Sequence, residues 1–306
     1  MKSDSPMSIN PYLILLLGVL ASGFSSIFTR MAEAPPLIIA FFRLGFTVLL
    51  IGVPTYVTGR AELAKARPRD LKLACLAGVF LALHFAVWIT SLRYTSIASS
   101  TVLVTMQPLF VIIGGYWLYQ ERINAVGLLG AVLALAGSVV IGVSDFRLGG
   151  QALYGDLLAF SGAIFLAGYV LIGRELRARM SLLPYTFMVY GAATLVLLIL
   201  NMVVQSSFYP YPSMTWVWFL ALAVVPTIFG HSIFSWALKY VKAAVVSVSI
   251  LGEPVGATIL AYLIFGEEPA LLQLAGGLVI IAGLYIFISS QNQQGGMDKQ
   301  LPLQEG

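Results

Sequence analysis

The chain is poor in charge and in the residues that build metal and disulfide sites. Only 10% of its 306 residues are charged, against roughly 25% in a typical soluble protein. A single cysteine, Cys75, excludes an intramolecular disulfide and a cysteine metal cluster. Its two histidines stand 147 positions apart, which is a poor basis for a metal site. With no nucleotide-binding glycine loop and no paired-histidine zinc motif either, the sequence predicts no catalytic residues, no metal, no cofactor and no enzyme.

Hydrophobic sequence dominates instead. Hydrophobic residues make up 59% of the chain, and apolar runs of about 20 residues, the length that spans a bilayer, recur along nearly all of it. The net charge of +4 therefore bears on orientation in a lipid bilayer and not on nucleic acid. We predict an all-α polytopic membrane protein with ten transmembrane helices at Tyr12–Met31, Leu37–Val57, Leu71–Leu92, Ile97–Leu118, Val126–Val143, Leu153–Ile172, Leu183–Val204, Met214–Trp236, Ala244–Phe265 and Leu271–Ser289.

Basic residues gather on one side of these helices. With ten spans, 13 of the 17 Lys and Arg residues fall on the side that holds both termini. Loops rich in Lys and Arg stay in the cytoplasm. We therefore expect a multi-pass protein of the bacterial inner membrane with both termini cytoplasmic, ending in a polar, disordered tail over residues 291–306.

The second half of the chain repeats the first at a constant offset of 146 positions. The shared proline, tyrosine, glutamate and glycine positions are Pro108/Pro254, Tyr94/Tyr240, Tyr116/Tyr262, Glu121/Glu267, Gly130/Gly276 and Gly137/Gly283. Such matches at one spacing indicate a duplicated unit, which we place at residues 12–143 and 153–289. Because each unit holds five helices, an odd number, the second must be inverted relative to the first. Inverted repeats are a recurring transporter architecture, with the solute near the middle of the bilayer where the repeats meet.

Glu253 is the leading candidate for a functional group. It lies about ten residues into the ninth span, where an ionisable side chain costs roughly 2.5–3.5 kcal/mol to insert. Pro254 follows it and leaves the carbonyl of Ile250 without its helical donor. The first repeat has Gln107-Pro108 at the same place. Glu253 is thus either a proton-carrying or amine-binding carboxylate, or a buried carboxylate that bridges helices, with Arg43 as the candidate partner.

Further polar and aromatic residues inside the spans have two interpretations each. The candidates for contact with a solute are Arg43, His84, Trp88, Tyr169, His231 and Trp236. A histidine can bind or titrate, and tryptophan offers a flat face to apolar or cationic solutes. The alternatives are that each histidine bridges two helices, that each tryptophan packs or anchors at an interface, and that Arg43 extends to the outer interface.

Hydroxyl and small residues form further patterns along the spans. The hydroxyls of Ser99, Thr101, Thr105, Ser247 and Ser249 either line a polar path or bond to the backbone one turn earlier. The small residues Gly130, Ala134, Ser138 and Gly142, with Gly276 and Gly283, predict close helix packing, within the chain or between the subunits of a homodimer.

The repeat carries motifs of a known family. Gln107-Pro108 through Gly115-Tyr116-Trp117 to Gln120-Glu121, its counterpart Glu253-Pro254 through Tyr262 to Gly266-Glu267, and Phe41–Phe46 around Arg43 resemble the EamA type of the drug/metabolite transporter (DMT) superfamily. The resemblance covers residues 12–289. The first repeat has Gln120-Glu121 where Gly-Glu is more usual, a departure in a loop that leaves the fold unaffected.

The resemblance implies a ten-helix inner-membrane carrier with a central cavity. Members mostly export amino acids, other metabolites or toxic compounds, many with the proton gradient, and some import or exchange solutes. Glu253 and Gln107 match the family motif, whereas His84, Trp88 and His231 belong to no motif. We expect a proton-coupled exporter of amino acids or similar small metabolites that works by alternating access. The alternatives are an importer or exchanger, a multidrug efflux carrier, a passive channel, or an enzyme embedded in the membrane that acts on lipids.

Overall fold

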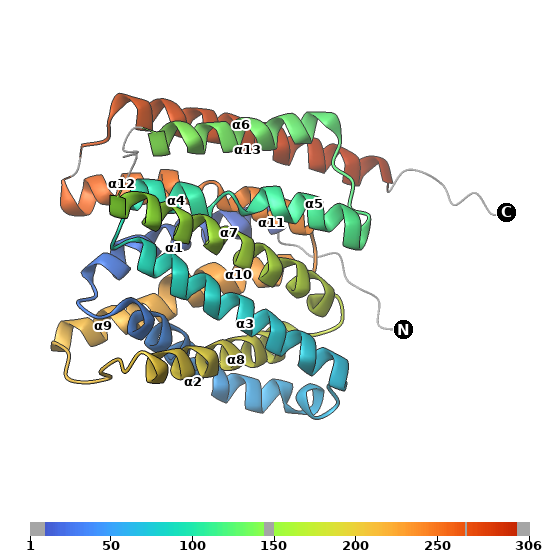
Figure 1. Ribbon diagram of the computed structural model, residues 1–306. Helices are drawn as coiled ribbons and strands as arrows, with labels where there is room; N and C mark the ends of the chain where they lie inside the picture. Colours follow the sequence, from blue (N-terminus) through green and yellow to red (C-terminus); the bar gives the residue numbers. More distant parts are fainter. Residues whose placement is uncertain (1–9, 144–149, 267, 299–306) are drawn as a thin grey trace.

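The computed structural model describes residues 10–143, 150–266 and 268–298 of the chain. Ten segments within them are long and apolar enough to cross a membrane, which confirms the predicted spans. The fourth, eighth and ninth of these segments are interrupted, so the described residues form thirteen α-helices and one π-helix (Figure 1). They are α1 (Pro11–Met31), α2 (Pro36–Ala64), α3 (Pro68–Ser91), α4 (Ile97–Val104), α5 (Gln107–Tyr119), α6 (Ala125–Val143), α7 (Gly150–Arg177), α8 (Leu182–Val203), α9 (Ser213–Leu222), η1 (Ala223–His231), α10 (Ser232–Ala237), α11 (Ala243–Ile250), α12 (Glu253–Phe265) and α13 (Leu271–Asp298).

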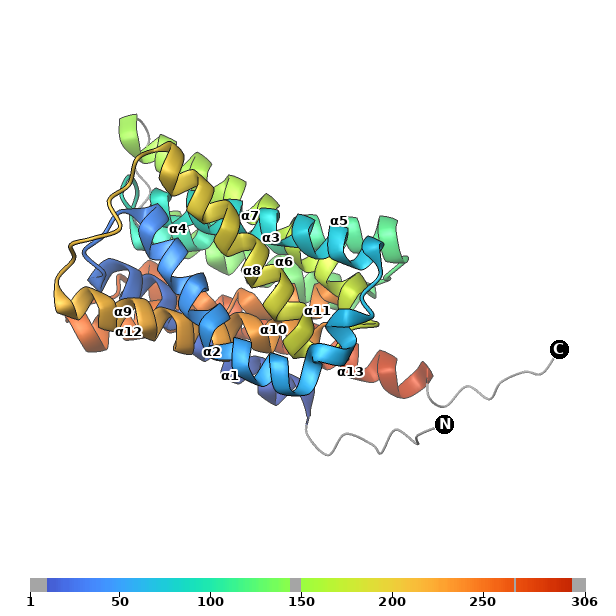
Figure 2. The same ribbon diagram turned by 90° about the horizontal axis from the view of Figure 1, so that it is seen from below.

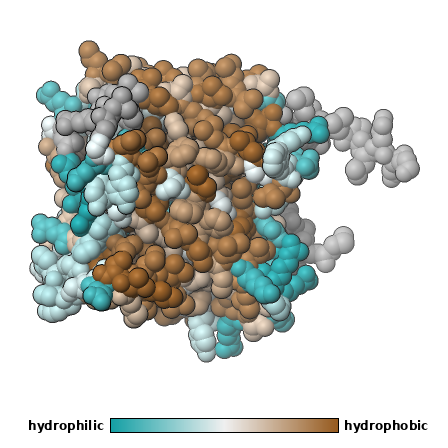
Figure 3. All heavy atoms as spheres, viewed as in Figure 1, coloured by the Kyte–Doolittle hydropathy of each residue, from teal (hydrophilic) through white to brown (hydrophobic). Residues whose placement is uncertain are grey.

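The surface matches a protein surrounded by lipid. Large apolar side chains such as Trp117 and Val53 are 75% and 72% exposed. The space-filling view shows a broad hydrophobic surface over the helices, with hydrophilic residues gathered towards its two sides (Figure 3). A soluble protein rarely exposes apolar patches of this extent. The chain is therefore a multi-pass membrane protein.

The repeats coincide in structure as well as in sequence. Helices α4 and α5 begin and end 146 positions before α11 and α12. Each pair closes with a residue in the left-handed conformation, Gln120 at φ 52° and Gly266 at φ 66°. Helices α6 and α13 begin 146 positions apart and run in opposite directions along one side of the bundle (Figure 1). The prediction of two inverted five-helix repeats is confirmed. Glu267, the counterpart of Glu121, lies outside the described residues.

Proline explains the two interruptions that the repeats share. Pro108 and Pro254 each stand in the first turn of the second helix of a pair. A proline ring has no N–H to donate to the carbonyl four residues earlier and clashes with that carbonyl. The first helix of each pair therefore ends before the proline, and the second begins at the residue that precedes the proline, Gln107 in α5 and Glu253 in α12.

Glycines bring α6 and α13 into backbone contact. A Cβ atom at Gly130 would lie 2.6 Å from the nitrogen of Phe287, and one at Gly137 would lie 2.6 Å from the carbonyl oxygen of Gly276. Both distances are shorter than side-chain carbons allow. Gly130 and Ala134 of the small-residue stripe on α6 thus pack on α13 within one chain, which is the first of the two roles predicted for them, whereas Gly142 faces Val102 of α4.

Two layers cover the middle of the bundle. Helices α6 and α13 form one side, and α2 and α8 pack together on the opposite side (Figures 1 and 2). Between them lie α3 and α7, the α1 helix and the two interrupted pairs. The middle layer holds most of the buried polar side chains, so it positions the candidate site.

The two ends of the bundle differ in charge. One end, which we call the basic end, holds Arg69, Arg122, Arg174, Arg179 and Lys242, and the chain enters and leaves there (Figure 1). The opposite end holds Arg30, Glu33 and Arg93.

The C-terminal helix is longer than the sequence predicts. We expected disorder from Gln291 onwards, but α13 continues to Asp298. Ser290 and Gln291 are only 3% and 6% exposed, and a Cβ at Gly127 of α6 would lie within 2.8 Å of both their side chains. Packing of Ser290 and Gln291 on α6 therefore stabilises the helix beyond the end of the apolar span. Residues 299–306 of the expected tail lie outside the described residues.

Candidate functional site

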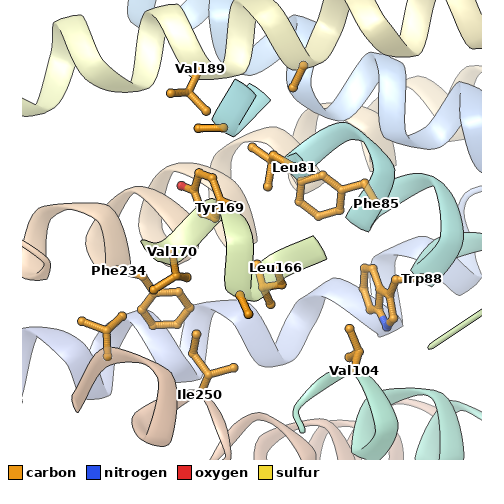
Figure 4. Packing of buried hydrophobic residues seen from close by; sticks show 14 of the residues in the cluster. Leu81, Phe85, Trp88, Val104, Leu166, Tyr169, Val170, Val189, Phe234 and Ile250 are labelled. Carbon is orange, nitrogen blue, oxygen red and sulfur yellow. The ribbon is translucent and has the colours of Figure 1, made fainter. Parts of the chain in front are cut away.

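A small cavity lies within the middle layer, where both interrupted pairs meet α1, α3 and α7. Its volume is about 20 Å³, which is room for about one water molecule. Both repeats contribute to its wall, as the inverted architecture predicts. The residues that line this central cavity are Ser22, Ser25, His84, Trp88, Val104, Thr105, Leu166, His231, Ile250 and Glu253. Figure 4 shows Trp88, Val104 and Leu166 close together in this region.

Glu253 reaches the cavity from the break between α11 and α12. It is the first residue of α12, and its side chain is partly accessible to the cavity that it lines. Val104 and Ile250 line the same cavity, and they are the residues whose carbonyls Pro108 and Pro254 leave without a helical donor. The interruption of both helices thus places a carboxylate and two residues whose carbonyls lack a helical donor around the same cavity.

Arg43 is held inside the bundle. Its side chain is fully buried; Nε donates to Thr227 Oγ1 at 2.8 Å and Nη1 donates to Ser25 Oγ at 2.6 Å. The guanidinium also lies 4.3 Å from the centre of the Phe85 ring. The prediction that Arg43 extends to the outer interface is wrong, because hydroxyl acceptors and an aromatic face take the place of water.

Arg43 and Glu253 do not form a direct ion pair. The ion pairs among the described residues, which join nitrogen and oxygen atoms no more than 4.0 Å apart, do not include them. The alternative that Glu253 is a helix-bridging carboxylate paired with Arg43 therefore has no direct ion pair to support it.

A π-helix shapes the second repeat beside Arg43. Pro226 lies inside η1 and cannot donate to the carbonyl of Leu222. The hydroxyl of Thr227 donates to that carbonyl instead, at 2.7 Å. Single π-helical turns often occur at functional sites. Here the wider turn lets one threonine satisfy the backbone and accept from Arg43 at the same time.

The two histidines, far apart in sequence, meet at the cavity. Their ring centres are 6.3 Å apart, and Trp88 lies nearly parallel to His84, at an interplanar angle of 4° and a distance of 6.1 Å. His84 Nδ1 is 3.0 Å from the carbonyl oxygen of Gly162. Because a carbonyl oxygen only accepts, Nδ1 carries a proton. In the neutral ring, Nε2 is then an acceptor, and His84 is one of the residues that line the cavity.

Three predicted residues lie away from the cavity. Tyr169 donates its hydroxyl to Ser235 Oγ, 2.7 Å away, since Ser235 in turn donates to the carbonyl of His231. Trp236 packs on Tyr240, with ring centres 4.7 Å apart. Gln107 is fully buried, and neither atom of its amide has a hydrogen-bond partner among the described residues. The structure thus brings together Glu253, His84, Trp88 and His231, with Arg43 behind them.

Serine and threonine residues of α1 and η1 were not predicted as part of the site. Ser22 and Ser25 line the cavity, and Ser25 and Thr227 hold Arg43. A signal was present in the sequence: Ser22, Ser25, Ser26 and Thr29 stand at positions i, i+3, i+4 and i+7 of an otherwise apolar helix. That spacing places all of them on one face of α1.

A larger space opens at the opposite end of the bundle. This vestibule has a volume of about 680 Å³ and is lined by the end of α1, the start of α2, the end of α3 and the turn before α4, including Ser26, Thr29, Ile89, Leu92 and Ile97. The hydroxyl face of α1 therefore contributes Ser22 and Ser25 to the central cavity and Ser26 and Thr29 to the vestibule.

Comparison with known proteins identifies the family of this architecture. The EamA-like transporter family matches residues 9–143 and 153–289. The chain belongs to the EamA-like transporter family. An uncharacterized transporter of Archaeoglobus fulgidus is 30% identical over 277 residues, 89% of this chain and 94% of that one. The pseudopaline exporter CntI of Pseudomonas aeruginosa (strain UCBPP-PA14) is 26% identical, over 87% of this chain and 93% of its own.

A solved structure supports the fold of this EamA-like protein. A crystal structure superposes with a TM-score of 0.75 over 92% of this chain and 98% of that chain, at 19% sequence identity. At that identity the likeness concerns the fold alone. The family match and the transporter relatives, and not this likeness, make the chain a membrane transporter of the drug/metabolite superfamily.

Proposed function

We propose that this EamA-like protein is a proton-coupled exporter of amino acids or similar small metabolites, working by alternating access. The observation that carries the proposal is the central cavity, which is lined by both inverted repeats and holds the carboxylate of Glu253. Rocking two inverted repeats against each other exposes such a site to one side of the membrane at a time. The relative named a pseudopaline exporter supports the export of a small solute.

The proton is carried by Glu253 in this proposal. A lone carboxylate deep in the bilayer is costly when charged, so gaining a proton stabilises a closed, dry cavity and losing it favours a hydrated, open one. The break before Pro254 lets α12 move relative to α11, so the charge of Glu253 can bias which side is open. Arg43 stays fixed by Ser25 and Thr227 and supplies a constant positive charge nearby.

The cavity wall suits the amine end of a solute. His84 offers the acceptor Nε2, Glu253 offers carboxylate oxygens, and Trp88 contributes its ring face. The Trp88 Nε1–H, buried with no hydrogen-bond partner among the described residues, is a donor that suits an oxygen of the solute instead. Carboxylates and aromatic faces favour cations. A volume of about 20 Å³ is too small for an amino acid, so the described state is closed around the site and binding requires it to widen.

Export also requires an orientation. By the positive-inside rule, the excess of Lys and Arg at the basic end supports an orientation with that end and both termini in the cytoplasm of a bacterial cell. The vestibule then faces outward. Labelling an epitope at each terminus in intact and permeabilised cells tests this, and labelling of intact cells would contradict it.

The test of the function uses purified protein in liposomes containing a pH-sensitive dye. Amino acids are added one at a time under an imposed pH gradient, and proton flux is recorded. We expect an amino acid-dependent flux from the wild type and at most a tenth of it from Glu253→Gln. The exposed Glu268→Gln is the matched acid-to-amide control and should behave as wild type. Proton-driven flux that survives in Glu253→Gln would overturn the coupling role. Export and toxicity screens on cells with and without the gene then identify the solute.

A further inference from the structure

Two arginines of α7 bind the end of α10 at the basic end. Arg177 Nε donates to the carbonyl oxygen of Ser235 at 2.9 Å, and Arg174 Nη1 donates to that of Leu238 at 3.1 Å. The last carbonyls of a helix have no donor within it. Arginine side chains supply donors and a charge that suits the negative end of the helix dipole. These two side chains therefore fix the end of α10 against α7.

Arg174 reaches into the first repeat as well. Its Nε lies 3.0 Å from Glu121 Oε1, and the Glu121 side chain is 9% exposed. Glu121 follows the left-handed residue Gln120 that ends α5. One arginine thus joins α5, α7 and α10, which come from both repeats. Nearby, the Tyr119 hydroxyl donates to the carbonyl of Leu171 at 2.6 Å, and Lys242 Nζ donates to that of Arg122 at 2.8 Å.

The symmetry-related positions at the opposite end carry no such residues. Moving back by 146 positions replaces Arg174 with Phe28 and Arg177 with Met31. The carbonyl acceptors Ser235 and Leu238 correspond to Ile89 and Leu92, and both of these line the vestibule. Arg174 and Arg177 thus have apolar equivalents in the first repeat, beside an open space of about 680 Å³. The same space is also lined by Arg30, Glu33 and Arg93, and Arg93 donates to the carbonyl of Ala34 at 2.8 Å.

We propose that Glu121, Arg174 and Arg177 form a latch that closes the basic end and must be released before the central cavity opens there. The latch spans both repeats, so a rocking motion between them has to break the contacts of Arg174. This inference rests on the proposed alternation between two openings, and it does not depend on which ion or solute is carried. Its three residues act through helix positions and do not line the central cavity.

Cysteine accessibility measures the latch directly. Cys75, the single cysteine, is replaced by serine, and Thr105→Cys provides a reporter in the cavity wall. A membrane-impermeant thiol reagent is added to vesicles with the C-terminus facing the medium and to vesicles of the opposite orientation. In Arg174→Gln we expect labelling from the basic end about tenfold faster than in the parent, which corresponds to roughly 1.4 kcal/mol, and slower labelling from the vestibule. Arg177→Gln should change labelling in the same direction.

Control variants separate the latch from general loosening. Arg69 lies at the same end and also pairs with a glutamate, Glu175 at 2.9 Å, but its side chain is 73% exposed. Exposed pairs contribute little, so Arg69→Gln should stay within about twofold of the parent. Arg174→Lys keeps a positive donor and should recover part of the parent behaviour.

Two results would overturn the latch. One is equal labelling in Arg174→Gln and Arg69→Gln. The other is faster labelling from both sides, which indicates loosened structure. The labelling experiment uses no solute and no proton gradient. A negative labelling result therefore leaves the proposed role of Glu253 untouched, and a negative flux result in liposomes leaves the latch untouched.

Discussion

Helices α4 and α5 of the first repeat superpose in sequence on α11 and α12 of the second, residue for residue at an offset of 146. Both pairs break before a proline and both end in a left-handed residue. At the break, however, the first has the neutral Gln107, fully buried, and the second has Glu253 on the cavity wall. Both repeats therefore keep the helix break before a proline. The residue at the break, Gln107 or Glu253, decides which repeat carries a charge there.

The comparison extends to the rest of the bundle. The glycines that join α6 to α13 come from equivalent positions of the two repeats, whereas the arginines at the end of α7 have apolar equivalents in α1. Packing is thus symmetric and polar chemistry is not. Substitutions at equivalent packing glycines should therefore have equal effects on stability. Substitutions at equivalent positions that differ in polarity should have unequal effects on transport.

Exchanging the two break residues should have the largest effect. In the variant Gln107→Glu/Glu253→Gln the acid moves to a side chain that does not line the cavity, so it cannot meet the solute path. We expect proton-linked flux in liposomes to fall about a hundredfold, the scale on which a positioned proton-transfer group typically acts. Flux restored by the exchange, relative to Glu253→Gln alone, would mean that the two breaks are functionally equivalent.

The histidines come next. His231 is equivalent to Phe85 in the first repeat, so His231→Phe makes the repeats alike at that position. His84 is oriented by the carbonyl of Gly162, and His84→Phe removes the acceptor Nε2 while keeping a ring beside Trp88. Since a hydrogen bond to a charged group contributes about 1.5–3 kcal/mol, we expect apparent solute affinity to fall about tenfold in His84→Phe. The His231→Phe variant should lose less. Equal losses in concentration-dependent transport would argue against an oriented acceptor at His84.

Much of this arrangement follows from sequence. Apolar runs and a fixed offset predict ten spans in two inverted repeats, because bilayer thickness sets helix length and a duplicated chain keeps its prolines. Sequence also makes Glu253, His84, Trp88 and His231 candidates, since polar and aromatic groups in the middle of a span need partners away from lipid. Their convergence does not follow, because Gln107, Tyr169 and Trp236 are candidates on the same grounds and lie away from the cavity.

The remaining contacts depend on tertiary structure. Ser25 and Thr227 bind Arg43, although hydroxyls in apolar helices more often bond to their own backbone. The π-helix arises from Pro226 and a threonine that no periodicity distinguishes. Gln107 shares the motif of Glu253 and does not line the cavity, because the two repeats surround the cavity unequally. Trp236 lies five residues after His231, which puts it on a different face of the helix.

Substitutions of the equivalent packing glycines should affect the stability of the protein equally. Gly130 and Gly276 are equivalent, and a Cβ at either would lie 2.6 Å from a backbone atom of the facing helix. Such overpacking costs about 1–3 kcal/mol, which exceeds the roughly 1 kcal/mol that alanine adds in helix propensity. We expect Gly130→Ala and Gly276→Ala to lower the thermal unfolding midpoint equally, by about 2–4 °C. Gly191, with open space around it, provides the control Gly191→Ala, which should not lower it. A large difference between the two equivalent variants would show that the scaffold too has lost its symmetry.

The smallest effect should come from the two tryptophans that the sequence alone does not distinguish. Trp88 lies parallel to His84 on the cavity wall, and Trp236 packs on Tyr240 away from it. Trp88→Phe keeps an aromatic ring but removes the Nε1–H and part of the face, so apparent solute affinity should fall about threefold, within the range of an exposed cation–π contact. Trp236→Phe should change it by less than twofold, as a substitution outside the site does. Measuring both variants in the same liposome assay shows which tryptophan contacts the solute. A larger loss of affinity in Trp236→Phe would mean that the solute path continues beyond Tyr169 and Ser235 towards the basic end.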